Sequence, residues 1–585
     1  MANPFRTNFH RADFCIVGGG MAGLCAALSA ARHGMKVVLM HDRPVLGGNA
    51  SSECRVHICG ADRHNQVKNM RETGILEELR LENLYRNPNR IFSVWDTILL
   101  EKAWAEPNLT LLLNCTCQSL EMDGNLIHSI TGWQLTTQTY HTIEARLFAD
   151  CSGDGILAPL SQAEFRMGRE ARHEFNESIE PEQADDKTMG MTILFQTRKY
   201  PNPQPFESPP WAHHFEECED LPYGNSGHHW WQMGYWWVEL GGERHSIHDT
   251  EALRDELLKT AYGVWDHIKN HCPEKKAAEN WALDWVQFMP AKRESRRYIG
   301  EHIQTQNDIE SGGHFDDLVA YGGWTMDDHH PAGFNAVRIN APATIFHRSP
   351  SPYGISYRCL YSRNIGNLLF AGRNASFSHA AMSSSRVMGT ACSMGQAVGV
   401  SAALAIQKGS FPSGMKSHIH EIQQALLHDD AYLPWIKQEF SKLTLVSTLI
   451  ASHGDPQSVR DGINRPVGNE MHSWMAQCGD WIAYIFPSGM SVESVTLLLD
   501  SALEKNIQMS YHQKDDQLTS PPDTMPKTFR LESLIEGNWM PLFQRTNNHQ
   551  RLVRLQLGKE MGGIRFVLDE TWGSDWSRVF AFYID

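Results

Sequence analysis

The chain has 585 residues, 41% hydrophobic and 21% charged, so it is too long for one core and should form two or three domains. Its formal net charge of −16 argues against nucleic acid or an anionic membrane as the main partner. Twelve cysteines without a small-scaffold spacing predict reduced thiols and a cytoplasmic protein. We expect no secretory signal, because three consecutive glycines split the N-terminal apolar run. No membrane span is expected either, since no stretch has about 18 uninterrupted apolar residues.

The first predicted elements form a nucleotide-binding unit. A buried strand, a glycine turn, a helix and a second strand are expected in this order at residues 14–17, 18–23, 22–32 and 36–40. The turn has the G-x-G-x-x-G spacing at Gly18, Gly20 and Gly23. In this spacing the first glycine allows the tight turn, the second lets the backbone approach a pyrophosphate, and the third lets the helix pack on the strand. The sequence therefore predicts a Rossmann-type α/β domain.

The second strand lacks the acidic residue that usually follows it and holds the adenosine ribose. His41 stands at this place and Asp42 comes one residue later. Asp42 can accept the ribose hydroxyl if the strand ends one residue late, and His41 can accept through one ring nitrogen. We favour Asp42 for this contact.

Three later segments point to the cofactor. They are "RPVLGGNASSE" after the second strand, "LFADCSGDG" at residues 147–155, and "NLLFAGRNASFSHAAMSSSRVMGTACSMGQAVGVSAALA" at 367–405. In this order they resemble FAD-dependent oxidoreductases with the glutathione reductase and fumarate reductase type of FAD-binding fold. The resemblance implies FAD, with the N-terminus of a long small-residue helix in the third segment facing the flavin. The residues expected to bind it are Gly18, Gly20, Met21, Ala22, Gly23, His41, Asp42, Arg43, Gly48, Asn49, Ala50, Ser51, Asp150, Gly153, Gly372, Arg373, Arg386, Val387 and Met388.

Two further features depart from that family's pattern. Many flavoproteins have Gly-Asp where this chain has Gly372 and Arg373, and an arginine there could pair with the pyrophosphate instead. The middle of the chain also lacks the second glycine fingerprint that glutathione-reductase-like enzymes use for NAD(P)H. The electron acceptor is therefore another carrier, which the sequence does not name.

Residues 161–345 are predicted to form an inserted α+β substrate cap between two parts of the FAD-binding domain, 1–160 and 346–440. Five aromatic residues crowd into "GNSGHHWWQMGYWWVELGG" at 224–242. Their rings suit either stacking on sugars or the core of the cap, and alternation around 235–239 predicts a strand. An amphipathic helix is expected at 250–270, with Thr250 as its N-cap.

The cap also supplies candidate catalytic residues in "PAKRESRRYIG" and "YGGWTMDDHHPAG". In the resembling family, similar segments lie at the substrate face of the flavin. The resemblance makes Arg297, Asp327 and His329 candidates for substrate binding and proton transfer, although the arginines could equally form a salt-bridged strand end. Adjacent residues in "DDHH" cannot easily converge on one ion, and we predict no metal site. Further substrate contacts are expected from Arg296, Trp324 and Arg358.

Oxidation of an alcohol needs a base, and histidine suits neutral pH. We expect His329 to be the base, with Asp327 orienting it. His379, just before the flavin-facing helix, is expected to position flavin or substrate, with Arg386 nearby to offset the charge of the reduced flavin.

Cys54 and Cys59 resemble the redox-active pair of disulfide reductases. However, the first cysteine follows the glycines too late, and the NAD(P)H fingerprint is missing. We therefore expect both thiols to serve in packing rather than as a redox dithiol.

Residues 441–585 change to short alternating segments separated by Gly, Pro, Asn and Ser. This pattern predicts a β-sandwich, and the order of its motifs resembles discoidin or galactose-binding-like domains. Such domains often bind carbohydrate, but here we expect the sandwich to brace the enzyme.

The leading hypothesis is an FAD enzyme that oxidises a secondary hydroxyl of a sugar, glycoside or polyol by hydride transfer to flavin N5. One alternative is the reduction of an activated C=C bond in a carboxylic acid, with arginines clamping the carboxylate. Another is a carbohydrate-binding protein that keeps FAD as a structural cofactor. The expected partner is a small carbohydrate-like molecule, and the chain could form a homo-oligomer.

Overall fold

The computed structural model describes residues 5–509 and 517–585, and the chain divides into two units. The first unit consists mainly of Met1–Gly60 and Ile91–His418, and the second of Ala61–Arg90, Ile419–Ile507 and Asp515–Asp585. Segment 61–90, which the sequence placed inside the FAD-binding domain, thus belongs to the second unit. The four domain segments predicted from the sequence stay predictions.

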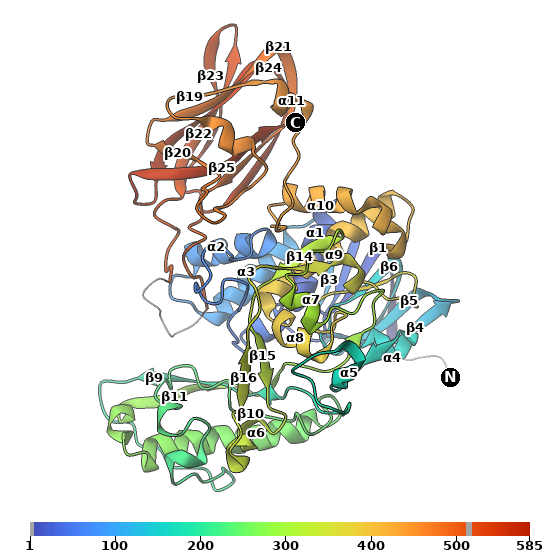
Figure 1. Ribbon diagram of the computed structural model, residues 1–585, viewed down its shortest axis with the longest axis vertical. Coiled ribbons are helices and arrows are strands. Elements are labelled where there is room, and N and C mark those ends of the chain that lie inside the picture. Colours follow the sequence, from blue (N-terminus) through green and yellow to red (C-terminus); the bar gives the residue numbers. More distant parts are fainter. Residues whose placement is uncertain (1–4, 510–516) are drawn as a thin grey trace. The chain divides into compact units, whose positions relative to one another are not determined.

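A parallel β-sheet forms the centre of the first unit (Figure 1). Its strands are β3 (Leu109–Leu112), β2 (Val37–Met40), β1 (Arg6–Val17), β6 (Thr139–Asp150) and β18 (Leu368–Phe370), and neighbours in this order run parallel. In the register, Cys15 of β1 lies between Val38 and Phe148. All four residues of β2 are buried, as expected for a parallel strand covered on both faces. This confirms the predicted Rossmann-type α/β class.

The same sheet continues as an antiparallel meander. The beginning of β6 pairs with β5 (Leu126–Gln134), which in turn pairs with β4 (Cys115–Asp123). On the side of β6 away from β1, the first part of the strand pairs with β5 and the last part pairs with β18. Only the end of β6 lies within the parallel part that precedes the cofactor loops.

Helices α1 (Met21–Arg32) and α9 (Met388–Gln407) pack against each other through small residues. A Cβ atom added at Gly395 or Gly399 would lie 2.1 Å from Ala22 O or 2.5 Å from Ala26 O, so the two backbones approach directly. The single long helix expected here is divided into α8 (His379–Ser385) and α9, because Arg386 and Val387 interrupt it.

By length and composition α9 could cross a membrane, but 83% of its most apolar window is buried inside the protein. A core helix has this property because it must be apolar all round.

The cap contains small sheets around helix α6 (Thr250–Asp266). Strands β8 (Met191–Thr192), β10 (Glu239–Leu240) and β12 (Ala291–Lys292) form one sheet, and β9 (Phe195–Lys199) pairs with β11 (Trp281–Val286). The strand expected at 235–239 is wrong for most of its length, since only Glu239 lies in β10. Trp231, Tyr235 and Trp237 pack into the cap core from turns and irregular chain rather than from a strand. The N-cap of α6 is Asp249 rather than Thr250.

The other helices and strands of the first unit surround these elements. They are α3 (Phe92–Trp104), α4 (Leu157–Ser161), β7 (Phe165–Arg166), α5 (Arg172–Phe175), β13 (Arg297–Tyr298), α7 (Gln306–Glu310), β14 (Leu318–Gly322), β15 (Met326–His329), β16 (Thr344–His347) and β17 (Tyr353–Ser356). β15 pairs with β16, and α8 packs against β15. These contacts bring the histidine at the start of α8 close to the acidic residues of β15.

The second unit is a two-layered antiparallel sandwich (Figure 1). Its strands are β19 (Thr448–Ala451), β20 (Trp474–Gln477), β21 (Trp481–Leu499), β22 (Pro526–Ile535), β23 (Asn538–Arg545), β24 (Leu552–Thr571) and β25 (Trp576–Ile584). The first half of β21 lies between β19 and β24, and its second half lies between β24 and β25. Register shifts between Ile485 and Ser494 separate the halves, so β21 and β24 pass from one layer to the other. This confirms the predicted sandwich.

Helix α2 (Ile75–Arg86) joins the second unit together with α10 (Ile419–His428) and α11 (Lys442–Val446). Buried Arg71 forms a two-atom ion pair with Glu77 and donates to the carbonyl oxygens of Ser501 and Ala502. Arg465 donates to the carbonyl oxygens of Asn69 and Arg71. Because a buried guanidinium needs all its partners, these arginines fix segment 61–90 to the sandwich.

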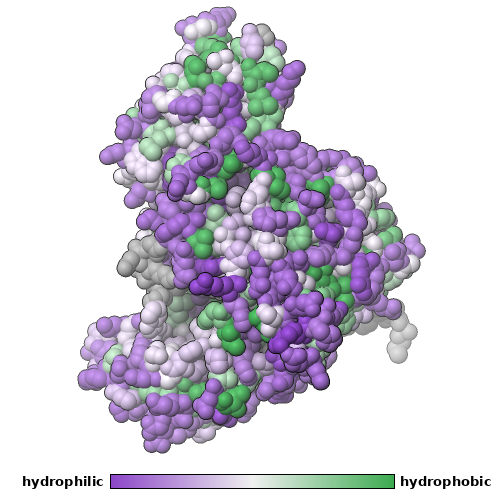
Figure 2. All heavy atoms as spheres, viewed as in Figure 1, coloured by the Kyte–Doolittle hydropathy of each residue, from purple (hydrophilic) through white to green (hydrophobic). Residues whose placement is uncertain are grey.

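On the face shown in Figure 2, hydrophilic residues predominate and hydrophobic ones form small separate groups. This distribution is ordinary for a protein surface. This face therefore offers no large apolar patch that could serve as a substrate site.

Candidate active site

A cavity of about 650 Å³ lies at the carboxyl ends of the parallel strands in the first unit. Its walls include the segments that directly follow β1, β2, β6 and β18, at 18–22, 41–43, 151–154 and 372–373. In open α/β sheets ligands bind outside the carboxyl ends of the strands. Predicted cofactor residues that line it are Gly18, Gly20, Met21, Ala22, His41, Asp42, Arg43, Gly48, Asn49, Gly153, Gly372, Arg373, Arg386, Val387 and Met388.

The glycines of the first loop have different physical roles. Gly18 has φ +104°, and a Cβ there would lie 2.4 Å from the backbone of Cys151. A Cβ at Gly23 would lie 1.8 Å from Gly18 O. By contrast, a Cβ at Gly20 would meet nothing closer than Gly48 Cα, at 3.9 Å. Gly18 and Gly23 are thus required by the packing of the chain, whereas the space beside Gly20 is open and fits a pyrophosphate. Gly48 forms the other side of this cradle with φ +57°, and a Cβ there would lie 3.1 Å from Gly20 Cα.

His41 belongs to the glycine loop rather than to a ribose site. It is 5% exposed, its Nδ1 accepts a hydrogen bond from Gly19 N at 3.0 Å, and its Nε2 lies 3.0 Å from Val45 O. Burial lowers the pKa of His41, so the neutral ring accepts at Nδ1 and donates at Nε2. With both ring nitrogens of His41 engaged, Asp42, whose side chain is 57% exposed beside the cavity, stays the predicted ribose acceptor.

A compact charge cluster forms the opposite wall. Asp154 accepts from Lys292 Nζ at 2.7 Å and from Arg373 Nη2 at 2.8 Å. Burial alone would raise the pKa of Asp154, but Arg373 and Lys292 outweigh it and lower the pKa. Arg373 Nε is buried without a hydrogen-bond partner among the described residues. The Nε–H group of Arg373 can therefore donate to a ligand beside the glycine loops.

The N-terminus of α9 completes the cavity at the end where the sequence predicts the flavin. Arg386, Val387 and Met388 line the cavity where the helix begins. Arg386 Nε is buried and has no hydrogen-bond partner in the described chain. The helix end and this donor both favour negative charge, which suits the reduced flavin. The backbone cradle, the spare donors and the helix end together fit FAD.

Four predicted cofactor residues lie behind the lining instead of in it: Gly23, Ala50, Ser51 and Asp150. Fully buried Asp150 accepts from Ser152 N at 2.9 Å, from Leu157 N at 2.8 Å and from the hydroxyl of Tyr298 at 2.7 Å. Its role in this structure is to shape the turn that carries Asp154. Ser51 similarly donates to Gly48 O at 2.7 Å.

His329 lies in a buried network that adjoins the cavity. Its Nδ1 is 2.6 Å from Glu239 Oε2, and its Nε2 is 3.4 Å from Asp327 Oδ2. Arg293 Nη1 lies 3.2 Å from Glu239, and Arg386 Nη2 lies 3.4 Å from Asp327. Both arginines line the cavity, although His329, Asp327 and Glu239 do not. Arg293 and Arg386 therefore lie between this network and the cavity.

His379 lies in a second network, which is enclosed. Its Nδ1 is 2.9 Å from Glu294 Oε2 and its Nε2 is 3.2 Å from Asp328 Oδ1. Burial alone would lower the pKa of His379, but Glu294 and Asp328 outweigh it and raise the pKa well above its ordinary value. His379 is thus protonated at neutral pH and donates from both nitrogens. These carboxylates engage both ring nitrogens of His379, and the ring does not line the cavity, so the structure gives no support for its expected contact with flavin or substrate.

Four other expected substrate residues also lie outside the cavity lining. Arg297 is 1% exposed and pairs with Glu170 and Glu294, so the alternative of a salt-bridged strand end describes it better. Arg358 pairs with Asp317, and Arg296 donates to Asp154 O at 3.2 Å.

Trp324 is the fourth, and its carbonyl oxygen accepts from Ser349 and Ser384. In this structure the side chains of Arg296, Arg297 and Arg358 support walls and turns, and Trp324 does so through its backbone carbonyl.

Some lining residues were not predicted from the sequence. They are Glu53, Cys54, Val56, His57, Cys59, Cys151, Ser152, Asp154, Thr250, Glu251, Arg254, Phe288, Met289, Pro290, Lys292, Arg293 and Ala391. Asp154 could have been found, since it belongs to the Asp-Gly turn of "CSGDG". Glu239 carries no sequence signal, because its role depends on a partner 90 positions away.

Comparisons with known proteins agree with this geometry for the first unit. The profile of the family described as "FAD dependent oxidoreductase" matches residues 13–426. No curated protein matches the chain.

Solved structures are similar only in parts. The family 32 carbohydrate-binding module of Streptococcus pneumoniae EndoD is 13% identical, covers 25% of this chain and 99% of its own, and has a TM-score of 0.19. A family 32 module of AlyQ in complex with 4,5-unsaturated mannuronic acid is 14% identical over 24% of this chain and 93% of its own, with a TM-score of 0.18. L-proline dehydrogenase from P. horikoshii is 17% identical over 25% of this chain and 24% of its own, with a TM-score of 0.16. These TM-scores are too low to support an argument about this chain.

Proposed function

Because the chain belongs to the FAD-dependent oxidoreductase family, we propose that it is a dehydrogenase acting on a secondary hydroxyl of a sugar, glycoside or polyol. Bound FAD supplies the hydride acceptor. The chain itself must then bind the sugar and take the hydroxyl proton. The observation that carries the proposal is an exposed aromatic ring, Trp236, in contact with His329.

Trp236 is suited to hold a sugar ring. Its side chain is 39% exposed, and its ring meets His329 edge-on at 5.5 Å between centroids. Phe288, 64% exposed, lines the cavity itself. Aromatic rings offer a large rigid face, against which the C–H face of a sugar can pack. Trp236 and Phe288 are therefore our candidates for the apolar part of the substrate site.

His329 is proposed to take the proton. Burial alone would raise the pKa of Glu239, but Arg293 and His329 outweigh it and lower the pKa, so Glu239 is an ionised partner for Nδ1–H. The 3.4 Å between Nε2 and Asp327 is longer than a good hydrogen bond. Nε2 is thus the ring atom less tightly held, and the imidazole and Asp327 can share an incoming proton.

The arginines of the cavity weaken the case for reduction of an unsaturated acid. Arg293 pairs with Glu239 and Arg386 with Asp327, and Arg254 pairs with Glu251 at 3.0 Å. A carboxylate substrate would have to share each of these guanidinium groups with the carboxylate already paired to it, which places two like charges at one cation. An uncharged hydroxyl substrate imposes no such cost.

The direct test is anaerobic mixing of the FAD-loaded protein with a panel of monosaccharides, glycosides and polyols while flavin absorbance is recorded. We expect at least one member to bleach the flavin. A second set, in which pre-reduced protein meets unsaturated carboxylic acids, tests the reverse chemistry. Reoxidation by an acid together with no bleaching by any sugar would contradict the proposal, and no response to either would favour a structural FAD.

A further inference from the structure

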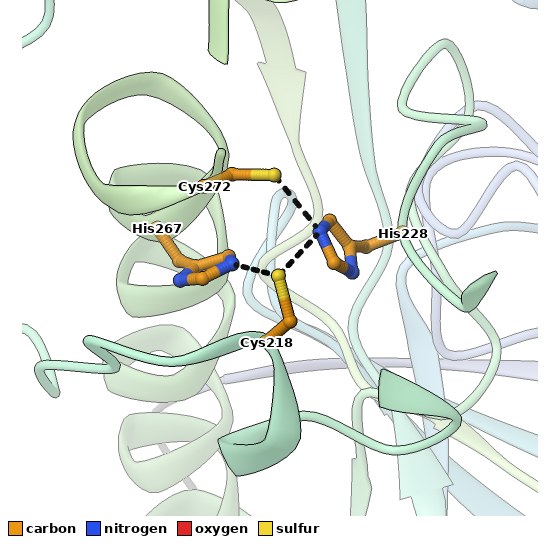
Figure 3. A group of neighbouring side chains, drawn as sticks. All are labelled: Cys218, His228, His267 and Cys272. Atoms are coloured by element: carbon orange, nitrogen blue, oxygen red, sulfur yellow. Dashed lines mark hydrogen bonds between the residues drawn. The ribbon is translucent and has the colours of Figure 1, made fainter. Parts of the chain in front are cut away.

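Four side chains that can ligate a metal meet inside the cap (Figure 3). They are Cys218, His228, His267 and Cys272, each at most 5% exposed. Their ligand atoms, two Sγ and two ring nitrogens, all lie within 4.8 Å of one another. None of the four lines the cofactor cavity. The cluster is thus separate from the proposed active site.

Local structure brings the four together from three segments. Cys218 begins the 3₁₀ turn Cys218–Asp220, and His228 follows the 3₁₀ turn Gly224–Ser226. His267 and Cys272 come from the end of α6, where the chain widens into a π-helical turn, His267–His271. Cys272 N donates to His267 O at 2.7 Å, which is the hydrogen bond of a π turn. Such turns are rare and often mark functional sites.

The widened turn has a direct consequence for the ligands. In a regular α-helix, residues three and four apart share a face, whereas residues five apart do not. The π turn lets His267 and Cys272 point to the same side, as Figure 3 shows. Without it, one of the two side chains would leave the cluster.

Both imidazoles are oriented for metal binding. His228 Nδ1 lies 3.0 Å from Gly224 O, and His267 Nδ1 lies 3.0 Å from Phe215 O. Because a carbonyl oxygen only accepts, each Nδ1 carries the hydrogen. Each Nε2 then presents its lone pair to the sulfurs, the arrangement that backbone carbonyls give to metal-bound histidines.

The distances between ligand atoms match a tetrahedral ion. His228 Nε2 is 3.7 Å from Cys218 Sγ and 3.2 Å from Cys272 Sγ, and His267 Nε2 is 3.4 Å from Cys218 Sγ. Zinc bonds of about 2.3 Å to sulfur and about 2.0 Å to nitrogen place neighbouring ligand atoms roughly 3.3–3.8 Å apart. Sulfur and imidazole ligands exclude calcium and magnesium, which take oxygen.

We propose that Cys218, His228, His267 and Cys272 bind one structural zinc ion that ties two loops of the cap to the end of α6. Four protein ligands leave no open position for water or substrate, so the ion is structural rather than catalytic. No metal site was predicted from the sequence, because these residues do not have the short paired spacing of known zinc motifs.

The test begins with the wild-type protein, purified under reducing conditions without chelator. Zinc is measured by elemental mass spectrometry and FAD by absorbance after release, and we expect about one zinc per chain. Removal of zinc with a chelator should lower the unfolding temperature of the first unit by about 5 °C or more, and added zinc chloride should restore it. Cobalt uptake by the stripped protein should give thiolate-type tetrahedral bands on the red side of the flavin spectrum.

Variants then locate the site. Cys218→Ser and Cys272→Ser should each lose most of the zinc. Cys115→Ser, a change of an equally buried cysteine in β4, should keep it. If the two serine variants do not fold, the zinc content and the cobalt spectrum of the wild-type protein still test the proposed zinc site.

Three results would overturn the proposal. They are wild-type protein that holds no stoichiometric zinc and takes up none from zinc chloride, iron as the only bound metal, and a disulfide between Cys218 and Cys272 in the intact mass of thiol-blocked protein. None of these readouts depends on the substrate, so the proposed dehydrogenase activity can fail without affecting the result.

Discussion

His329 and His379 each lie between one buried and one partly buried carboxylate, and in both cases the partly buried one comes from β15. Asp327 faces His329, and the next residue, Asp328, faces His379. Successive side chains of a strand point to opposite faces, so one strand supplies both networks. The second carboxylates are Glu239 and Glu294.

The two networks differ in what lies beyond them. His329 adjoins an exposed tryptophan and two arginines of the cavity, whereas His379 is surrounded by further buried carboxylates. One of these, Glu180, is 1% exposed, and neither of its oxygens has a hydrogen-bond partner among the described residues. Burial raises the pKa of Glu180 to about 7. Similar histidine–carboxylate networks can thus support proton transfer in one place and hold the fold together in another, depending on their access to the cavity.

Replacing His329 with alanine should produce the largest difference between the two networks. Loss of a general base typically costs about 10²- to 10⁴-fold, and we expect that loss in the rate of flavin reduction by substrate. FAD content should stay unchanged, and raising the pH should partly restore the rate as the substrate hydroxyl loses its proton more readily. Stopped-flow absorbance measures the effect.

His379→Ala is the matched comparison for that experiment, with His379→Gln as a version that keeps one hydrogen bond. Both should reduce flavin at close to the wild-type rate if they retain FAD. A larger loss for His379→Ala than for His329→Ala would reverse the assignment of the two histidines.

Glu180→Gln sharpens the comparison through pH. The carboxyl of Glu180 has a pKa of about 7 in the folded chain but an ordinary value of 4.5 when unfolded. Between these values the folded state holds more protons, so the stability contributed by Glu180 falls as pH rises. Glutamine stays neutral, and above pH 7 we expect the variant to be more stable than wild type by about 2 to 3 kcal/mol.

Urea unfolding followed by flavin release measures this difference at several pH values. Below about pH 4.5 the advantage should vanish, because both side chains are then neutral. Glu207→Gln, a change at an exposed position, should have little effect at any pH. An advantage for Glu180→Gln that does not change with pH would argue against a raised pKa.

Trp236→Ala tests whether the exposed ring beside His329 binds substrate. Removing the ring should raise KM about tenfold, equivalent to a loss of about 1.4 kcal/mol of binding, with a smaller change in kcat. Trp230→Ala, at a more exposed ring with 62% of its surface accessible, is the control and should leave KM close to wild type. Equal effects of the two changes would remove Trp236 from the substrate site.

Cys54→Ser and Cys59→Ser should have the smallest effects. Cys54 is 2% exposed and lies 3.4 Å from Met289 O. Burial raises its pKa to about 12, so the reactive thiolate is scarce at neutral pH. We expect each variant to keep its rate of flavin reduction within about threefold. A joint loss of two orders of magnitude with FAD bound would instead indicate a redox dithiol.

The sequence by itself determined the nucleotide-binding half, because its features are local. A buried strand, three spaced glycines and a small-residue helix set backbone conformation and close packing within a few residues. The alternating strands of the sandwich are local in the same sense. For this reason residues that the sequence predicts to bind one cofactor, among them Gly20, Gly48 and Val387, line one cavity in the structure.

Only the tertiary structure decided the charge networks and the metal cluster, because their members are far apart in the chain. Glu239 acquires its role from His329, and Asp154 from Arg373, 219 positions away. Cys218 meets His267 only after two loops have folded onto α6. A side chain's pKa and its ligands depend on the groups that folding places around it, and no local pattern encodes those neighbours.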